Sequence, residues 1–130
     1  MNYYGARDIA ESFRTVRKNT IQVAEDIPEE KYSYRAAPDT MSVAEMLAHL
    51  AAITHWAEQC FFVVKKTNVS MEDFGRWMGE LGAKGKALTT KAQIVGALKT
   101  EGEKFAKLLD GLSEAQLAQP ITAPNATKSA

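Results

Sequence analysis

The segment SVAEMLAHLAAITHWAEQCFFVVKK, residues 42–66, carries the clearest structural signal in the chain. Its apolar residues recur at spacings of three and four, which places them on one face of a helix. Ser42 and Glu45 have the spacing of a capping box, in which hydroxyl and carboxylate each accept a backbone N–H of the first turn. We therefore predict a long helix from Ser42 to about Lys66, with Leu50 at the centre of its buried face. The recurring residues are Val43, Met46, Leu50, Ile53, Ala57, Cys60 and Val64.

Two further amphipathic helices flank this segment. The first is predicted from about Ala6 to Ile27, and Pro28 ends it, leaving a connection with at most one short turn near residues 29–32. The third is predicted from Thr90, which forms a second capping box with Gln93, to about Gly111. Their stripes are Ile9, Phe13, Val16, Thr20, Val23 and Ile27 in the first, and Ile94, Leu98, Phe105, Leu108 and Leu112 in the third.

The remaining segments have weaker patterns. Glycines at positions 75, 79, 82 and 85 disfavour a long helix, so residues 67–90 are predicted as a long crossover, in which MEDFGRWMGEL, residues 71–81, can form a short or irregular helix. In the tail, Ser113 and Gln116 can cap one short turn, and Asn125-Ala126-Thr127 resembles the cap of a further helix. No run shows the apolar and polar alternation of a strand.

These patterns predict an all-α fold of a single domain, residues 1–130. With 45% hydrophobic residues, a chain of this length can bury one core and is too short for two. Three helices that each carry one apolar stripe pack best as an antiparallel up-and-down bundle. We expect either a three-helix domain or a four-helix bundle whose last helix is missing from this chain.

The composition limits the partners and the compartment. Sixteen Lys plus Arg balance sixteen Asp plus Glu without a basic stripe, which argues against nucleic acid or an anionic membrane as partner. No run approaches the roughly 20 apolar residues of a membrane span, and the polar start MNYYGARD is unlike a secretory signal. The single Cys60 cannot form an internal disulfide, so we expect a cytoplasmic protein.

The chain has two histidines that could carry chemistry. On the predicted helix, His49 lies at the edge of the apolar stripe and His55 nearly opposite it, where solvent is expected. His49 is either a boundary residue hydrogen-bonded to a neighbour or a metal ligand. Catalytic zinc takes three protein ligands, and the sequence offers no pair of histidines at helical spacing to complete such a site.

Glu101 breaks the pattern of the third helix, because a carboxylate falls within its apolar stripe. Such a group pairs, binds a metal, has its pKa raised by desolvation, or extends to solvent at the helix edge. Cys60 is interpreted as a small buried residue. Trp56 and Trp77 are interpreted as packing residues, with a ligand-lining role as the alternative.

The sequence IPEEKYSYRAAPDTMSVAEMLAHLAAITHW, residues 27–56, resembles the DinB-like superfamily, which includes the damage-inducible DinB and YfiT-like proteins. The cue is the succession of Pro, Tyr, Arg-x-Ala-Pro, Met-Ser and Ala-Glu-x-Leu-Ala-His-Leu. The resemblance implies a four-helix bundle with a long crossover between its second and third helices. It also implies a divalent metal held by three histidines, one of them at the position of His49.

The other two histidines of that pattern form a His-x-x-x-His pair on a fourth helix, which this chain does not contain. The resemblance therefore extends to His49 alone, with Glu101 a possible neighbour in the same cavity, and implies an incomplete zinc or nickel site. It further implies a metal-dependent enzyme of thiol-transferase or hydrolase type, acting on a small thiol or another small molecule. The alternative is a metal-free helical scaffold or small-ligand binding module.

A homodimer is also expected. The groove left by a missing fourth helix would expose apolar surface that self-association can cover, and the resemblance implies a two-fold dimer.

Overall fold

The computed structural model describes residues 5–65, 67–123 and 126–129, and it is largely helical. The all-α bundle predicted from the sequence is confirmed. In chain order the elements are α1 (Ala6–Asp26), the 3-10 turn η1 (Glu29–Lys31), α2 (Val43–Ala52), α3 (Thr54–Ala57), the π-helical turn η2 (Glu58–Val63), α4 (Met71–Lys86), α5 (Lys91–Asp110), α6 (Glu114–Ala118), β1 (Pro120–Ala123) and β2 (Ala126–Ser129).

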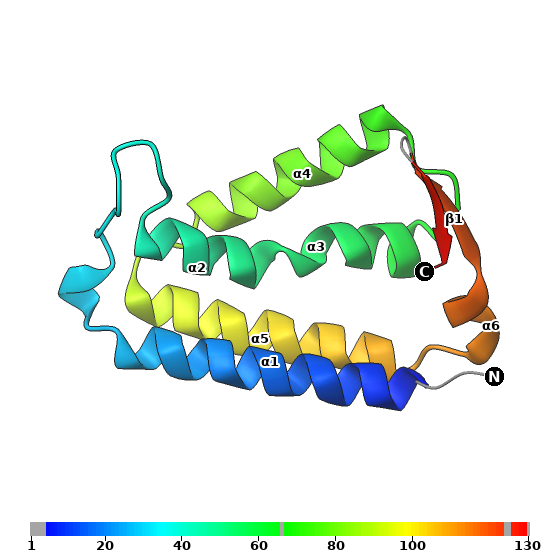
Figure 1. Ribbon diagram of the computed structural model, residues 1–130, viewed down its shortest axis with the longest axis horizontal. Helices are drawn as coiled ribbons and strands as arrows, with labels where there is room; N and C mark the ends of the chain where they lie inside the picture. Colours follow the sequence, from blue (N-terminus) through cyan, green and yellow to red (C-terminus); the bar gives the residue numbers. More distant parts are fainter. Residues whose placement is uncertain (1–4, 66, 124–125, 130) are drawn as a thin grey trace.

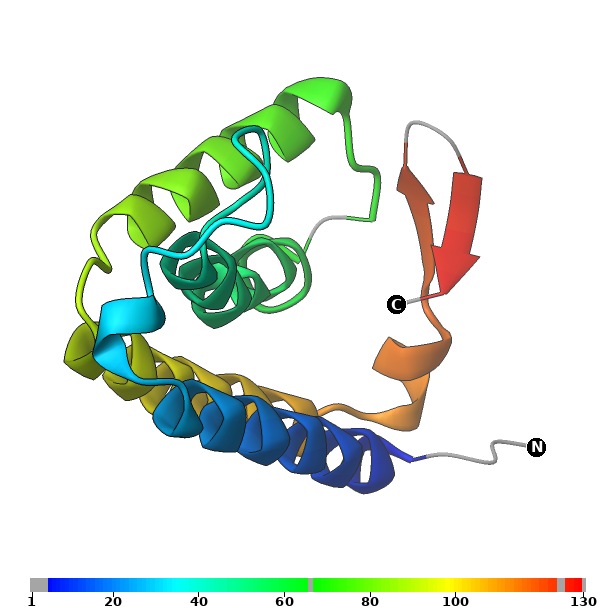
Figure 2. The ribbon, with the colours of Figure 1, turned by 60° about the vertical axis from the view of Figure 1, so that its left-hand side comes forward.

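The long helices form three layers (Figures 1 and 2). Helices α1 and α5 lie side by side in the first layer, α2 packs on α5 in the second, and α4 packs on α2 and α3 in the third. One buried apolar cluster joins α1, α2 and α5 around Ile94 and Leu98. A second cluster joins η2, α4 and β1 around Cys60, Trp77 and Ile121.

The helix starts follow the predicted caps. The hydroxyl of Ser42 accepts the backbone N–H of Glu45 at 3.1 Å, and the carboxylate of Glu45 accepts the N–H of Ser42. The same reciprocal pair forms between Thr90 and Gln93 and between Ser113 and Gln116. Each box satisfies backbone donors that a helix cannot satisfy within its first turn.

The crossover contains a longer helix than the sequence predicts, because α4 runs from Met71 to Lys86, beyond the short or irregular helix predicted for residues 71–81. Ser70 caps this helix by accepting the N–H of Asp73 at 3.1 Å, a start signal with Asp in place of Glu. Its glycines lower helix propensity, and no close packing requires three of them, since a Cβ added at Gly75, Gly79 or Gly82 meets no atom within 4 Å. Trp77 and Leu81 are almost fully buried and offset the low helix propensity of the glycines.

The second predicted helix is helical to Val63 but is interrupted. It turns at Ile53, between α2 and α3, and widens into η2. Arg17 of α1 donates to the carbonyl of Leu50, just before this break, at 3.1 Å. A side chain that inserts into the backbone hydrogen-bond ladder is a recognised cause of such a kink.

The predicted buried faces of the first two helices are rotated from the real ones. Leu50 is 38% exposed, and Val16 and Val23 are 63% and 54% exposed. Mostly small side chains lie where α1 and α2 contact their neighbouring helices, which lets the helices pack closely. Several larger apolar residues lie at the edges of these contacts and are partly exposed. The buried residues are Ala10, Arg17 and Ala24 in α1, and Leu47, Ala48, Ala51 and Ala52 in α2.

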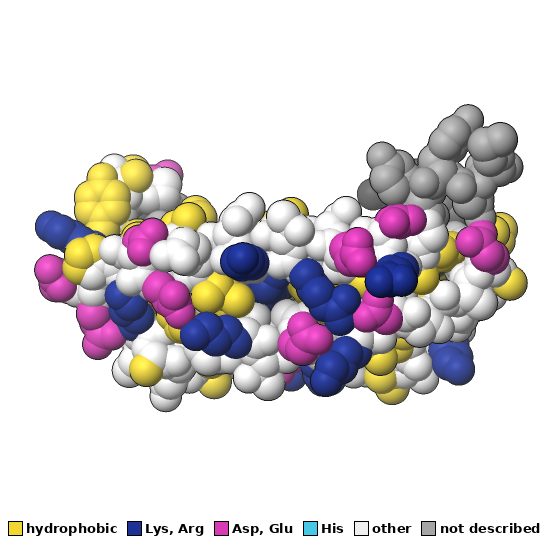
Figure 3. All heavy atoms as spheres, turned by 90° about the horizontal axis from the view of Figure 1, so that it is seen from below, with side chains coloured by type: hydrophobic (Ala, Val, Ile, Leu, Met, Phe, Trp, Pro, Cys, Tyr) yellow, Lys and Arg dark blue, Asp and Glu magenta, His cyan; other side chains and the backbone are white. Residues whose placement is uncertain are grey.

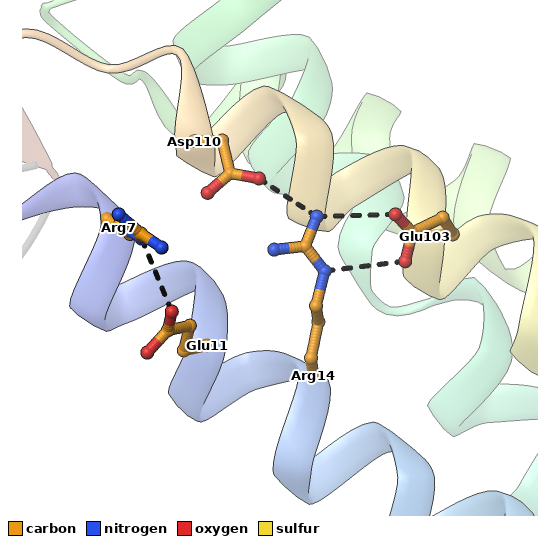
Figure 4. Close-up of polar contacts among 5 residues, drawn as sticks. All are labelled: Arg7, Glu11, Arg14, Glu103 and Asp110. Carbon is orange, nitrogen blue, oxygen red and sulfur yellow. Dashed lines mark hydrogen bonds and ion pairs between the residues drawn. The ribbon is translucent and has the colours of Figure 1, made fainter.

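Charged residues bridge the outer face of the first layer. Arg14 of α1 contacts Glu103 and Asp110 of α5, at 3.2 and 2.9 Å (Figure 4). Arg7 and Glu11 pair along α1. Side chains of both signs alternate over this underside of the molecule (Figure 3), and exposed pairs of this kind add little to stability.

The tail differs from the prediction that no strand is present. Strands β1 and β2 pair antiparallel, with Ile121 opposite Lys128, and β1 also bridges to Asn68. Each strand is too short to show alternation in the sequence. Of the predicted helix cap at residues 125–127, Asn125 lies outside the described residues and the other two belong to β2. In the described ranges, no helix is long and apolar enough to cross a membrane.

Gly102 permits the close contact between α1 and α5. A Cβ at this position would lie 2.7 Å from Cγ of Arg17, which is too near for any side chain. Gly96 lies on the same helix with no atom within 4 Å of an added Cβ. The two glycines therefore differ in packing while sharing one helix.

We predict opposite effects for alanine at these two positions. Gly102→Ala displaces Arg17 and should lower the free energy of unfolding by about 1–2 kcal/mol, although alanine favours helix. Gly96→Ala should raise it by about 0.5–1 kcal/mol, because it gains propensity without a clash. Urea unfolding of both variants measures this difference. Equal stabilisation by both alanines would contradict the packing role of Gly102.

Candidate functional site

A groove of about 910 Å³ runs between α2, the C-terminal half of α4, and the connection from η1 to α2. We call it the His49 groove. Its apolar floor consists of small or aliphatic residues of the facing helices α2 and α4 and of the connection that follows α4: Ala44, Ala48, Leu81, Gly82, Gly85 and Leu88. Its polar lining comes from Glu29, Glu30, Ser33, Arg35, Glu45, His49, Lys86, Thr89, Thr90 and Lys91, among others.

Two cations at the rim already have partners. The Arg35 guanidinium pairs with both carboxylate oxygens of Glu45 and donates to the Thr40 carbonyl at 2.7 Å. The Lys91 ammonium donates to the carbonyls of Glu25 and Ile27, each at 2.7 Å, at the end of α1. A cation there also complements the negative end of the helix dipole. These groups shape the groove and have little capacity left for a ligand.

The Arg35 contact changes the acidity of Glu45. Hydrogen bonds from the Arg35 guanidinium, and then from the Ser42 backbone, hold the pKa of the Glu45 carboxyl below its ordinary value of 4.5. The same pair raises the pKa of Arg35. Glu45 is thus committed to capping α2 and fixing the connection, rather than to acid–base chemistry.

His49 is the titratable side chain that remains available on α2. It is partly buried, and its ring makes no hydrogen bond within the described part of the chain, while its backbone carbonyl accepts the N–H of Ile53 at 2.8 Å. Lys86, at the end of α4, likewise has no ion pair among the described residues. An imidazole beside an apolar floor can donate or accept one hydrogen bond to a bound molecule.

His55 is not solvated, contrary to the expectation from the sequence. Its side chain is 12% exposed, and its Nε2 lies 2.6 Å from Oε2 of Glu80. The error follows from the rotated face of α2, because α4 covers the side that the sequence assigned to solvent. His55 therefore holds α3 to α4 and does not line the His49 groove.

Glu101 lies elsewhere in the bundle. Its carboxylate is 4.0 Å from the Lys104 ammonium on the same helix, and its charge opposes the lowering of the Arg17 pKa by burial. It does not line the His49 groove, so the structure does not bring Glu101 and His49 into one cavity. Glu101 is thus partly exposed and pairs with Lys104, which is the ion-pairing interpretation of this residue.

Three buried charged residues were not identified from the sequence, one of them Asp73, which is 4% exposed and pairs with Arg76 at 3.3 Å. Glu58 is 4% exposed and pairs with Lys104 at 3.2 Å, and Arg17 is 8% exposed. The spacing of Arg17 from Ala10 and Ala24, seven residues on either side, was the signal that could have placed it on the buried face. By contrast, Cys60 and Trp77 are buried, as predicted.

The residues of the His49 groove do not fit a metal ion. Across residues 5–65, 67–123 and 126–129, no group of three His, Cys, Asp or Glu is placed to hold one. The nearest acid along α2 is Glu45, whose oxygens are taken by Arg35 and the backbone of Ser42. A zinc site needs at least three protein ligands, and the groove offers one imidazole.

The connection beside the groove gives a pH prediction. Because the Glu45 pKa is lowered in the folded state, its carboxylate stabilises the fold above the ordinary pKa, and that contribution is lost as the pH falls through the lowered value. Glu45→Gln should therefore unfold more easily at neutral pH and lose less stability below about pH 5. Chemical unfolding at several pH values measures how the free energy of unfolding changes with pH in the unmodified protein and in Glu45→Gln.

Glu30→Gln is the matched control, since it removes a carboxylate of the same groove that forms no ion pair among the described residues. Its stability should follow that of the unmodified protein across the pH series. Parallel curves for Glu45→Gln and the unmodified protein would contradict the role assigned to the Arg35–Glu45 contact.

Comparison with known families agrees with the layout of the helices. The model of the DinB superfamily matches residues 12–130 of the chain. No curated protein and no solved structure matches it.

Proposed function

The chain belongs to the DinB superfamily, and from this premise we propose that it is a small-ligand binding module whose site is the His49 groove. The observation that carries the proposal is the pairing of an apolar floor with one available imidazole. Small-molecule sites are concave and mostly apolar, with a few polar groups that orient the ligand. The ligand class that fits is a small molecule with an apolar body and one polar group that hydrogen-bonds to His49.

The helices support this site from both sides. At Gly85, α4 lies near α2, since a Cβ there would be 3.9 Å from the Ala48 carbonyl oxygen, an ordinary contact distance. Gly82 faces open space in the groove. The segment between α1 and α2 is held at both ends, by the bond from Lys91 to the Ile27 carbonyl and by the pair of Arg35 with Glu45. These contacts do not involve a ligand, so binding requires little ordering of the groove.

We predict that Gly82→Leu blocks ligand binding without harming the fold. The added side chain enters open space in the groove, and leucine favours helix more than glycine does. Amide shifts of Ala48 and Gly85 should respond to small amphipathic fragments in the unmodified protein and not in this variant. His49→Ala should weaken the binding of those fragments.

Gly79→Leu is the control, because Gly79 lies on the same helix in open space but does not line the groove. It should bind the same fragments as the unmodified protein. Fragments that shift only residues outside the groove, or that bind equally to Gly82→Leu, would contradict the proposed site.

The second candidate function is the metal-dependent one, a thiol transferase or hydrolase, favoured by family membership and by the position of His49 in a groove. It requires further ligands, from outside the described residues or from another molecule. We infer no catalytic step for it, because the groove itself lacks a ligand set.

We expect Zn²⁺ or Ni²⁺ to bind this 130-residue chain weakly, through His49, because a single imidazole leaves most coordination positions to water. Ni²⁺ should broaden the ring signals of His49 in NMR spectra at concentrations that leave His55, held by Glu80, unaffected. Calorimetric titration should show that His49→Ala abolishes the Zn²⁺ heat. Tight binding, or binding that survives this substitution, would contradict the incomplete site.

A further inference from the structure

The tail after α5 crosses one end of the bundle, from the end of that helix to the segment that leads into α4 (Figures 1 and 2). Its packing against the helices is narrow. Among residues 111–122, Ile121 is buried, Leu112 and Leu117 are half-buried, and the others are exposed. Helix α6 has no buried residue. The tail is therefore anchored in the protein interior by one side chain rather than by an apolar face.

Two backbone hydrogen bonds join the tail to the segment before α4. Thr122 donates its N–H to the Thr67 carbonyl, and Val69 donates its N–H to the Thr122 carbonyl, each at 2.7 Å. Together they form a parallel bridge between Asn68 and Thr122. Bonds of this kind add little net stability, because bonds to water replace them when the bridge opens. The burial of Ile121 is thus the main contact that holds β1 in place.

Ile121 covers an apolar site at this end of the bundle. It packs with Cys60 of η2, with Val69, and with Trp77 of α4. Cys60 is fully buried, and Trp77 is 1% exposed. This cluster is separate from the one that joins α1, α2 and α5. Movement of Ile121 out of the site therefore uncovers an indole and a thiol without disturbing the other cluster.

We propose that residues 112–123 form a strap that opens over this site as one unit, while the core of α1, α2 and α5 stays folded. Segments with few buried apolar contacts and short backbone pairing open locally at a lower free energy than the whole protein. The opening also acts on α4, because the burial of Trp77 offsets the low helix propensity of the glycines in that helix. The strap thus controls how firmly the first half of α4 is held.

The rate at which a small aromatic disulfide modifies Cys60 tests the strap in the whole chain. Cys60 is the single cysteine and is fully buried, so the reagent reaches it after its cover opens. When opening and closing are faster than the chemical step, the measured rate is proportional to the opening equilibrium constant. We expect Cys60 to react in the folded chain. Urea should accelerate this reaction less steeply than it promotes global unfolding, because a local opening exposes less surface.

Valine at Ile121 and valine at Ile94 make a matched pair, because each change shortens one buried isoleucine, in a different cluster. Ile121→Val should raise the Cys60 modification rate about two- to tenfold through the strap. Ile94→Val should make the bundle easier to unfold in urea and leave that rate unchanged. In Ile121→Val, amide exchange at Val69 and Thr122 should accelerate by the same factor as the thiol reaction, because one unit opens.

The proposal is overturned if Cys60 reacts only through unfolding of the whole chain. In that case both valine variants raise the modification rate in proportion to their loss of global stability, and urea acts equally on the thiol reaction and on unfolding. An unchanged Cys60 rate in Ile121→Val also overturns it. So does a thiol that reacts while the amide protons of Val69 and Thr122 stay protected, because the reagent then enters by a route that leaves the strap closed.

Discussion

The buried guanidinium of Arg17 is the contact on which the arrangement of the helices depends. One side chain of α1 donates to a carbonyl of α2 and to a carbonyl of α5, so it joins the three helices of the core at one point. Burial lowers the Arg17 pKa, which measures the cost of removing this cation from water. Two charge-assisted hydrogen bonds and the Phe13 ring, 5.2 Å away, offset that cost. A planar fork with several donors can reach two helices, whereas an ammonium could not do so with fixed geometry.

The motif that carries the family resemblance has a structural role around this core. The Tyr32 hydroxyl donates to the Ala24 carbonyl at the end of α1, and Arg35 pairs with Glu45 at the start of α2. Lys91 then ties the start of α5 to the end of α1. These contacts fix where α2 begins and how it is rotated. They therefore set the position of His49, and the recognisable part of the sequence builds the groove rather than its chemistry.

Helix limits could be predicted from the sequence because they depend on local chemistry. Capping boxes at Ser42, Thr90 and Ser113 and the proline at position 28 act within a few residues, and all of them appear in the structure as predicted. Helix rotation could not be predicted, because hydrophobic periodicity gives most weight to large side chains. Here the helices meet on alanine, glycine and the stem of Arg17, while valine, methionine and leucine line an open groove. Which face of a helix is buried depends on partners distant in sequence. The same holds for the burial that stabilises the glycine-rich helix α4.

The rotation of α2 also decides what can complete a site at His49. Consecutive residues on a helix differ by about 100°, so His49 and Leu50 line different grooves on either side of α2. A helix that filled the apolar groove between α1 and α2 would cover Met46 and Leu50, which line that groove, whereas His49 lines the other one. Additional metal ligands must instead reach the groove between α2 and α4, where Arg35 and Lys91 already occupy the rim with fixed partners. In this arrangement, the apolar groove between α1 and α2 and the groove that holds His49 are separate, and α2 lines both.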